Sequence, residues 1–162
     1  MRICGVDPGL QITGYAVLES ANGSMRVLEA GVIRPGTGGS LEGRLAKLAE
    51  GIEELLGEHK PGLMAVEALY SHYRHPRTAI MMGHARGVIL ASAARRDVKV
   101  LSFSATEIKK SLTGNGQASK TQMQRAIVRT LTLPRIPEPA DVADALAVAL
   151  CASQRRVRRA AR

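Results

Sequence analysis

Residues 2–17 read RICGVDPGLQITGYAV, and they decide the fold because two apolar, strand-like runs meet there at a chain-breaking turn. The first run ends at Asp7, and Pro8 and Gly9 follow it directly. An ionised carboxylate at the end of a buried strand is unfavourable by several kcal/mol unless it is paired, protonated or bound to a cation. The position of Asp7 therefore points to a function that needs a carboxylate there.

The rest of the chain alternates strand-like and helix-like segments. Apolar runs predict strands at 2–6, 14–19, 25–34, 63–70 and 98–103, with Asn22-Gly23 as a hairpin signal. Apolar spacing and capping boxes predict helices at 41–56 and 77–96, after Ser104, after Ser119, and at 140–155. The first three strands have short connections and the later ones have helical crossovers, so the sequence predicts an α/β fold with a mixed sheet.

Four carboxylates stand out by their context. Asp7 ends the first predicted strand, Glu67 interrupts the fourth, and Asp141 and Asp144 share one face at the start of the last helix. Any one of them could be a helix cap or part of a salt bridge. If the first and fourth strands are neighbours, however, all four acids can converge. Such a cluster suits hard divalent cations, which prefer oxygen ligands and can support phosphodiester hydrolysis.

Length and composition limit the class of protein. The chain has 162 residues, enough for one domain that buries about two thirds of its unfolded surface without a disulfide. No apolar run approaches the ~20 residues of a membrane span, and the start MRICGVDPG lacks the pattern of a secretory signal. Cys4 and Cys151 belong to no CxxC pair. We expect a cytoplasmic protein with reduced thiols and no membrane partner.

The charge indicates a polyanionic partner. Lys and Arg number 23 against 14 Asp and Glu, a formal charge of +9. Five arginines lie in residues 155–162, so the body alone carries 9 − 5 = +4. We expect a single domain at 1–154 and a disordered basic tail at 155–162. The tail either contacts phosphate groups or is a solvated end of the chain.

Five segments carry a resemblance to a known family: GVDPGLQITGYAV, MAVEALY, GHARGVILA, ATEIKKSLTGNGQASKTQMQ and ADVADALAVAL. In this order and spacing, over about residues 1–152, the chain resembles the bacterial RuvC Holliday-junction resolvases. The resemblance implies a ribonuclease-H-like fold with a five-stranded mixed sheet flanked by helices. It implies a homodimer that nicks two strands of a four-way junction symmetrically, with RuvA and RuvB as branch-migration partners.

The resemblance also assigns residues. It makes Asp7, Glu67, Asp141 and Asp144 the catalytic acids and the ligands of Mg²⁺, with two ions per site expected and Mn²⁺ as a substitute. This chain has an acid at position 144, where some members of the family have a histidine.

Further residues are assigned to DNA. By the resemblance, Tyr70 stacks on junction bases, and Lys109 and Lys120 lie near the active site, with Lys120 both catalytic and in contact with a phosphate. Charge and position alone suggest that Arg74 and Arg77 hold the DNA backbone. Lys109 and Lys120 could instead be ordinary solvated lysines, and Tyr70 could be a strand-end residue with its hydroxyl in water.

Other functions fit the sequence less well. His72 and His75 resemble half of a zinc site, but no cysteine or further histidine lies nearby to complete four ligands. An acid and glycine after a strand also resemble the phosphate loop of sugar-kinase-like ATPases, which need two such domains. A catalytically silent DNA-binding relative is the remaining alternative, although all four acids are present.

Overall fold

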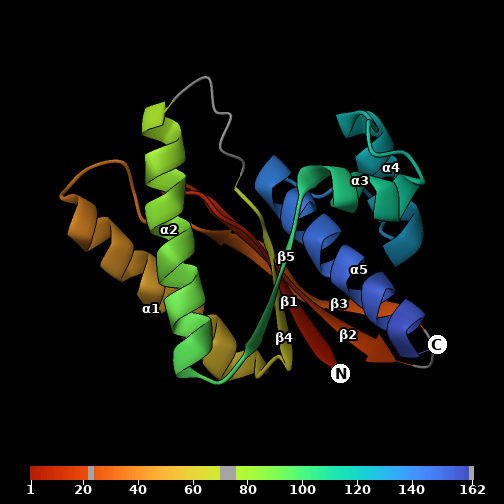
Figure 1. Cartoon of the computed structure of the whole chain (residues 1–162), viewed down its shortest axis with the longest axis horizontal. Helices are drawn as coiled ribbons and strands as arrows, with labels where there is room; N and C mark the ends of the chain where they lie inside the picture. The colour runs from red at the N-terminus through yellow and green to blue at the C-terminus, as the bar shows by residue number, and fades with distance from the viewer. Residues whose placement is uncertain (22–23, 70–75, 161–162) are drawn as a thin grey trace.

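The computed structural model describes residues 1–21, 24–69 and 76–160, with side chains through Arg155. A five-stranded sheet has the order β3-β2-β1-β4-β5, as Figure 1 shows. Its strand β1 runs antiparallel to β2 and parallel to β4. The predicted mixed α/β sheet is therefore confirmed. The elements are β1 (Arg2–Asp7), β2 (Thr13–Ala21), β3 (Ser24–Ile33), α1 (Leu41–His59), β4 (Leu63–Glu67), α2 (Pro76–Arg95), β5 (Lys99–Phe103), α3 (Ala105–Thr113), α4 (Lys120–Leu131) and α5 (Ala140–Ala160).

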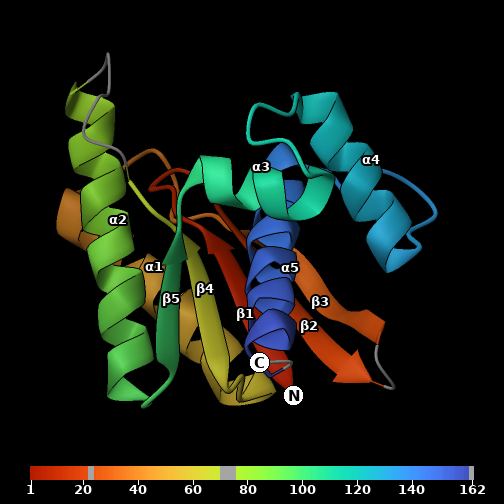
Figure 2. The same ribbon diagram turned by 45° about the vertical axis from the view of Figure 1, so that its right-hand side comes forward.

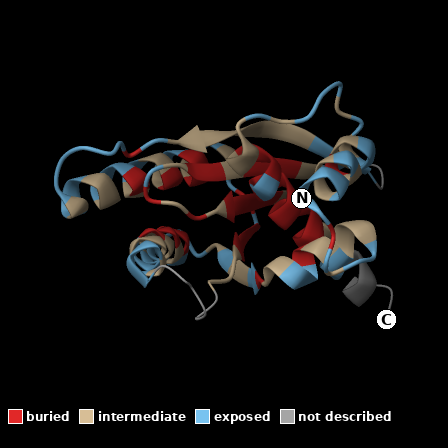
Figure 3. Ribbon diagram, turned by 90° about the horizontal axis from the view of Figure 1, so that it is seen from above, coloured by how far each residue is buried: buried red, intermediate tan, exposed pale blue. Residues whose placement is uncertain are grey.

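Helices cover both faces of the sheet. Figures 1 and 2 show α1 and α2 on one face and α5, with α3 and α4 beyond it, on the other. Side chains along β1 point alternately to the two faces of the sheet. Ile3 packs in the core beneath α5, whereas Cys4 and Val6 pack in the core beneath α1 and α2. Figure 3 shows the buried residues between these layers and the exposed ones on their outer sides.

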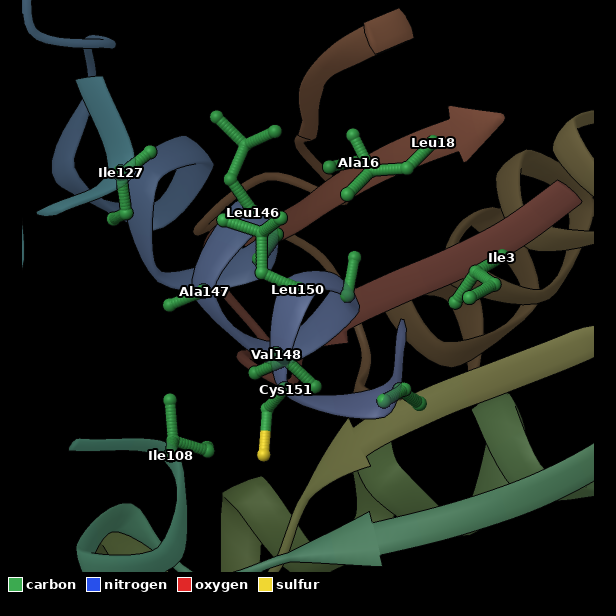
Figure 4. Packing of buried hydrophobic residues seen from close by; sticks show 14 of the residues in the cluster. Ile3, Ala16, Leu18, Ile108, Ile127, Leu146, Ala147, Val148, Leu150 and Cys151 are labelled. Atoms are coloured by element: carbon green, nitrogen blue, oxygen red, sulfur yellow. The ribbon is translucent and has the colours of Figure 1, made fainter. Parts of the chain in front are cut away.

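Helix α5 is the centre of one core. Figure 4 shows Leu146 and Leu150 of α5 beside strands β1 and β2, with Ile108 of α3 and Ile127 of α4 on the helix's other side. A helix that is packed on both sides needs apolar residues on nearly every face. The run from Val142 to Ala152 is buried except at Asp144, which is exposed.

Two glycines let α5 approach the sheet closely. A Cβ on Gly5 of β1 would overlap the carbonyl oxygen of Ala145 and come within 2.7 Å of the Cβ of Ala149. A Cβ on Gly14 of β2 would overlap the carbonyl oxygen of Asp141. Since any larger residue would push the helix outward, these glycines set the position of the first turns of α5.

Several boundaries differ from the prediction. Strand β4 ends at Glu67 rather than at residue 70. We expected residues 155–162 to be disordered, but helix α5 continues to Ala160. The backbone of residues 155–160 is therefore helical. Arginine and alanine are good helix formers, and no glycine or proline interrupts this segment. The guanidinium of Arg155 also lies over the Phe103 ring, 5.4 Å from its centroid.

The helix caps follow the prediction. Ser104 and Ser119 each accept from the backbone of the third residue of their helix, and each box is closed by the side chain of that residue. Cys4 and Cys151 are both buried and form no disulfide, and burial raises the pKa of Cys4 to about 12. No helix in the part of the chain that the structure describes is long and apolar enough to cross a membrane.

Candidate active site

Asp7 and Glu67 lie beside each other at one edge of the sheet. Strands β1 and β4 are parallel neighbours whose register pairs Val6 with Val66, so the next residue on each strand is the acid. Alternation places both acids on the α5 face, in line with Gly5 and Ala65. The expectation that the first and fourth strands are neighbours is confirmed.

Asp141 and Asp144 come to the same edge from α5. The helix begins at Ala140, and the close approach of Asp141 to Gly14 fixes its first turn against β2, beside the end of β1. Residues three apart on a helix share a face. An acid in the first turn also interacts favourably with the partial positive charge of the helix N-terminus.

The electrostatics of the site show that the four acids act on one another. Burial, followed by the charges of Glu67, Asp144 and Asp141, raises the pKa of Asp7 from 3.8 to about 7. Burial and the charge of Asp144 raise the pKa of Glu67. Burial also raises the pKa of Asp144, and the charge of Asp141 adds to that shift. Carboxylates that share a site in this way favour a cation between them.

The acids lie between two open pockets. One, here called the α4 pocket, has a volume of about 270 Å³ and is lined by Glu67 and Asp144 together with Lys109 and Lys120. The other, here called the α2 pocket, has a volume of about 580 Å³ and is lined by Asp7, Asp141, Arg77 and the loop after β1. Each pocket therefore combines two of the acids with basic side chains.

Both predicted lysines lie close enough to influence the acids. The charge of Lys120 lowers the pKa of Asp144, against the larger effect of burial. The charge of Lys109 likewise lowers the pKa of Glu67. Lys120 is exposed at the first position of α4, and Lys109 is half-buried on α3. The two lysines therefore offset part of the negative charge of the acids in the α4 pocket.

The donor set fits divalent cations that prefer oxygen. All four acids offer carboxylate oxygens, and among the described residues neither a cysteine nor a histidine lines the two pockets. Hard cations such as Mg²⁺ prefer such ligands. Burial and the repulsion of the other acids together raise the pKa of Asp7, and a bound cation would offset both effects.

A different group has the tightest spacing of possible metal ligands. Among the described residues, Glu29, Glu58 and His59 have ligand atoms within 4.8 Å of one another. The His59 Nε2 lies 2.7 Å from one oxygen of Glu29, and the Tyr15 hydroxyl donates to the other at 2.6 Å. Because both oxygens of Glu29 already have partners in the protein, we interpret this group as a hydrogen-bonded contact that joins β3 to the end of α1.

Sequence reasoning missed Arg44, which holds the loop after Asp7. Its Nε donates to the carbonyl oxygen of Gly36 at 2.8 Å, and its Nη2 donates to that of Leu10 at 3.0 Å. Arg44 also lines the α2 pocket. A lone arginine on an amphipathic helix has the sequence pattern of a solvated residue, so no spacing signal could have identified it.

Arg86 has a similar relation to Glu67. Its Nε donates to the backbone carbonyl of Glu67 at 3.3 Å, and its Nη2 donates to Ser102 Oγ at 2.7 Å. It therefore links α2 to the ends of β4 and β5. Its segment, GHARGVILA, contributed to the family resemblance, but no feature of that segment singles out this arginine.

Of the remaining residues predicted to contact DNA, the structure describes only Arg77. Arg77 lies exposed on α2 and lines the α2 pocket. Tyr70 and Arg74, together with His72 and His75, fall in residues 70–75, outside the described residues. Their roles therefore stay predictions from the sequence.

Comparisons with known proteins agree with this arrangement. The crossover junction endodeoxyribonuclease RuvC of Rhodopirellula baltica is 49% identical over 149 residues, which cover 92% of this chain and 84% of that protein. The RuvC of Desulforamulus reducens is 40% identical over 154 residues, 95% of this chain and 94% of that protein. The structure of Thermus thermophilus RuvC in complex with Holliday junction substrate matches with a TM-score of 0.91 and 28% identity, over 96% of this chain and 94% of that one.

These likenesses confirm the expected ribonuclease-H-like fold. The family model described as crossover junction endodeoxyribonuclease RuvC matches residues 3–152, which include all four acids and both lysines of the site. The chain therefore belongs to the RuvC family of crossover junction endodeoxyribonucleases.

Proposed function

We propose that this protein resolves Holliday junctions in DNA recombination and repair, by nicking two strands of the four-way junction symmetrically within a nuclease domain at residues 1–154. The observation that carries the proposal is the convergence of four interacting acids between two pockets that also contain basic side chains. The basic side chains attract the phosphate backbone, and the acids supply the ligands for a cation at the bond to be cut.

The proposed metal ligands are Asp7, Glu67, Asp141 and Asp144. They fit Mg²⁺, with two ions per site and with Mn²⁺ as a substitute, because all of them are oxygen donors. When bound, such ions supply charge that stabilises the attacking and leaving oxygens of phosphodiester hydrolysis.

The side chains around the acids have supporting roles. Lys120 favours the ionised form of Asp144 and, from its exposed position at the start of α4, can reach a phosphate oxygen where negative charge develops. Lys109 favours the ionised form of Glu67 in the same way. Both lysines thereby keep the acids ready to accept a cation near neutral pH.

DNA contacts extend the proposal away from the acids. Arg77 lies at the rim of the α2 pocket, where its guanidinium can hold a backbone phosphate next to Asp7 and Asp141. Tyr70 and Arg74 precede α2 in the sequence and are proposed to stack on a base and to contact the backbone, respectively.

A homodimer is part of the proposal, since two strands must be cut. The outer side of α2 supports it: Ile80 is 58% exposed, and Gly83 and Gly87 follow at three- and four-residue spacing with open space around them. A second copy could cover this apolar, closely approachable face. RuvA and RuvB remain the proposed branch-migration partners. The two buried cysteines form no disulfide, which suits the cytoplasm, where disulfides are rare.

The decisive experiment compares a synthetic four-way junction with a linear duplex of the same sequence, with and without Mg²⁺ or Mn²⁺. We expect paired, symmetric nicks in the junction alone and only with metal. Equal cutting of the duplex would overturn the junction selectivity. Binding without cutting under every metal condition would favour the silent relative, and ATP hydrolysis without nuclease activity would favour the ATPase-like alternative.

A further inference from the structure

The α2 pocket is larger than a metal site requires. Its walls are the Pro8–Ile12 loop and the first turns of α2, and Asp7 and Asp141 form one side of it. Its volume of about 580 Å³ lies in the range of pockets that hold small organic ligands. A ligand in it would therefore touch the proposed cleavage centre directly.

The lining of the α2 pocket combines apolar and basic surfaces. Met81 and Met82 contribute thioether side chains from α2, Leu10 and Ile12 contribute aliphatic ones from the loop, and Arg77 is exposed beside them. Methionine makes favourable contacts with aromatic rings. A nucleotide matches this combination, since its base is an aromatic plane and its phosphate is an anion.

The loop wall of this pocket is held from both sides. The hydroxyl of Thr13 hydrogen-bonds the carbonyl oxygen of Gly9, and the backbone N–H of Gly9 donates to the same hydroxyl at 3.3 Å. Arg44 donates from α1 to the carbonyl oxygen of Leu10 at 3.0 Å. The pocket is thus largely formed before any ligand enters, which lowers the entropy lost on binding.

We propose that the α2 pocket receives the base of one nucleotide that flanks the scissile phosphate, with the base lying against Met82. The inference rests on the proposed nuclease function and extends it to a subsite. The flanking base is then unstacked from its strand, and its contact with the protein fixes the scissile phosphate beside Asp7 and Asp141. Arg77 holds the neighbouring backbone.

The experiment uses junctions in which an abasic sugar replaces the nucleotide on either side of the cleavage site. For the wild type, we expect the abasic sugar at one of the two positions to lower kcat/KM by roughly 5- to 150-fold, the range of a lost base contact. Met82→Ala should lower kcat/KM on the intact junction and remove most of the abasic penalty. Met25→Ala, a matched change near the opposite end of the sheet, should keep the full penalty.

A second variant tests the pocket without altering a partly buried side chain. Thr78 is exposed at the start of α2 and lines the pocket, so Thr78→Phe should fill it from the rim. This variant should cut the intact junction more slowly and should also be insensitive to the abasic sugar.

An abasic penalty that is the same in the wild type, Met82→Ala and Thr78→Phe at both flanking positions would overturn the subsite. This outcome differs from a failure of the proposed function. In that case the wild type would cut no junction at all, and the subsite would fall with it.

Discussion

The carboxylate of Asp7 should make the metal-free protein less stable than an amide at the same position would. Burial and the charges of Glu67, Asp144 and Asp141 raise the pKa of Asp7 from 3.8 to about 7. Above that pH the native state must hold an ionised group where ionisation is disfavoured. We therefore expect Asp7→Asn to abolish cleavage and, at the same time, to raise the free energy of unfolding.

The size of the effect depends on pH, and its sign follows from proton binding. Between about pH 4 and pH 7 the native state holds the Asp7 proton more tightly than the unfolded state, so wild-type stability falls as pH rises through this window. A pKa difference of about 3 corresponds to about 4 kcal/mol once both states are ionised. The advantage of Asp7→Asn should therefore grow from about 1.5 kcal/mol at pH 5 to about 4 kcal/mol at pH 8.

Urea unfolding in the presence of a chelator at pH 5 and pH 8 measures this advantage directly. Glu50→Gln, at an exposed position of α1, is the matched control and should change little at either pH. Adding Mg²⁺ should stabilise the wild type more than Asp7→Asn, because the ion binds only the native site. Equal unfolding free energies at pH 8, or an advantage that does not grow with pH, would refute the reasoning.

Three further changes test other parts of the structure. Lys120→Ala removes a charge that lowers the pKa of Asp144, so the pH at half-maximal single-turnover cleavage should rise. Lys120→Arg should restore that pH. A pH–rate profile that is the same in Lys120→Ala and the wild type would contradict the role of Lys120. Arg44→Lys replaces two donor nitrogens that face different carbonyl groups by a single one, so it should lower the free energy of unfolding by about 1 kcal/mol, whereas Lys47→Ala on the same helix should not. Deleting residues 156–162 removes four arginines, so the slope of log K against log salt concentration for junction binding should fall in magnitude by up to about 3.6. An unchanged slope would show that these arginines do not contact the DNA.

The sequence predicted those parts of the site that depend on strand order and helix periodicity. Apolar runs that end in Asp7 and Glu67 placed the two acids at strand ends, and the three-residue spacing of Asp141 and Asp144 placed those on one helical face. The parallel pairing of β1 and β4 then brings the strands' acids together. The sequence pattern alone does not determine which strands are neighbours, so this pairing was an assumption of the prediction.

Contacts made by long, flexible side chains could not be predicted in this way. Arg44 and Arg86 reach backbone carbonyls of the site across separate elements, and neither residue departs from the ordinary composition of an amphipathic helix. The extension of α5 to Ala160 was missed for another reason: a run of arginines has the composition of a solvated tail as much as that of a helix end.

Repulsion among the four acids is tolerated because other contacts hold the elements that carry them. Asp7 and Glu67 end strands whose apolar residues lie in both cores, and α5 is buried behind Asp144 from Ala145 to Ala152. The close approach at Gly5 and Gly14 prevents α5 from relaxing away from the strand ends. The site therefore holds its four carboxyl groups together without a cation, and a cation that binds there meets ligands that are already in place. For this reason we expect Gly5 and Gly14, which carry no ligand atom, to influence how tightly the site binds a cation.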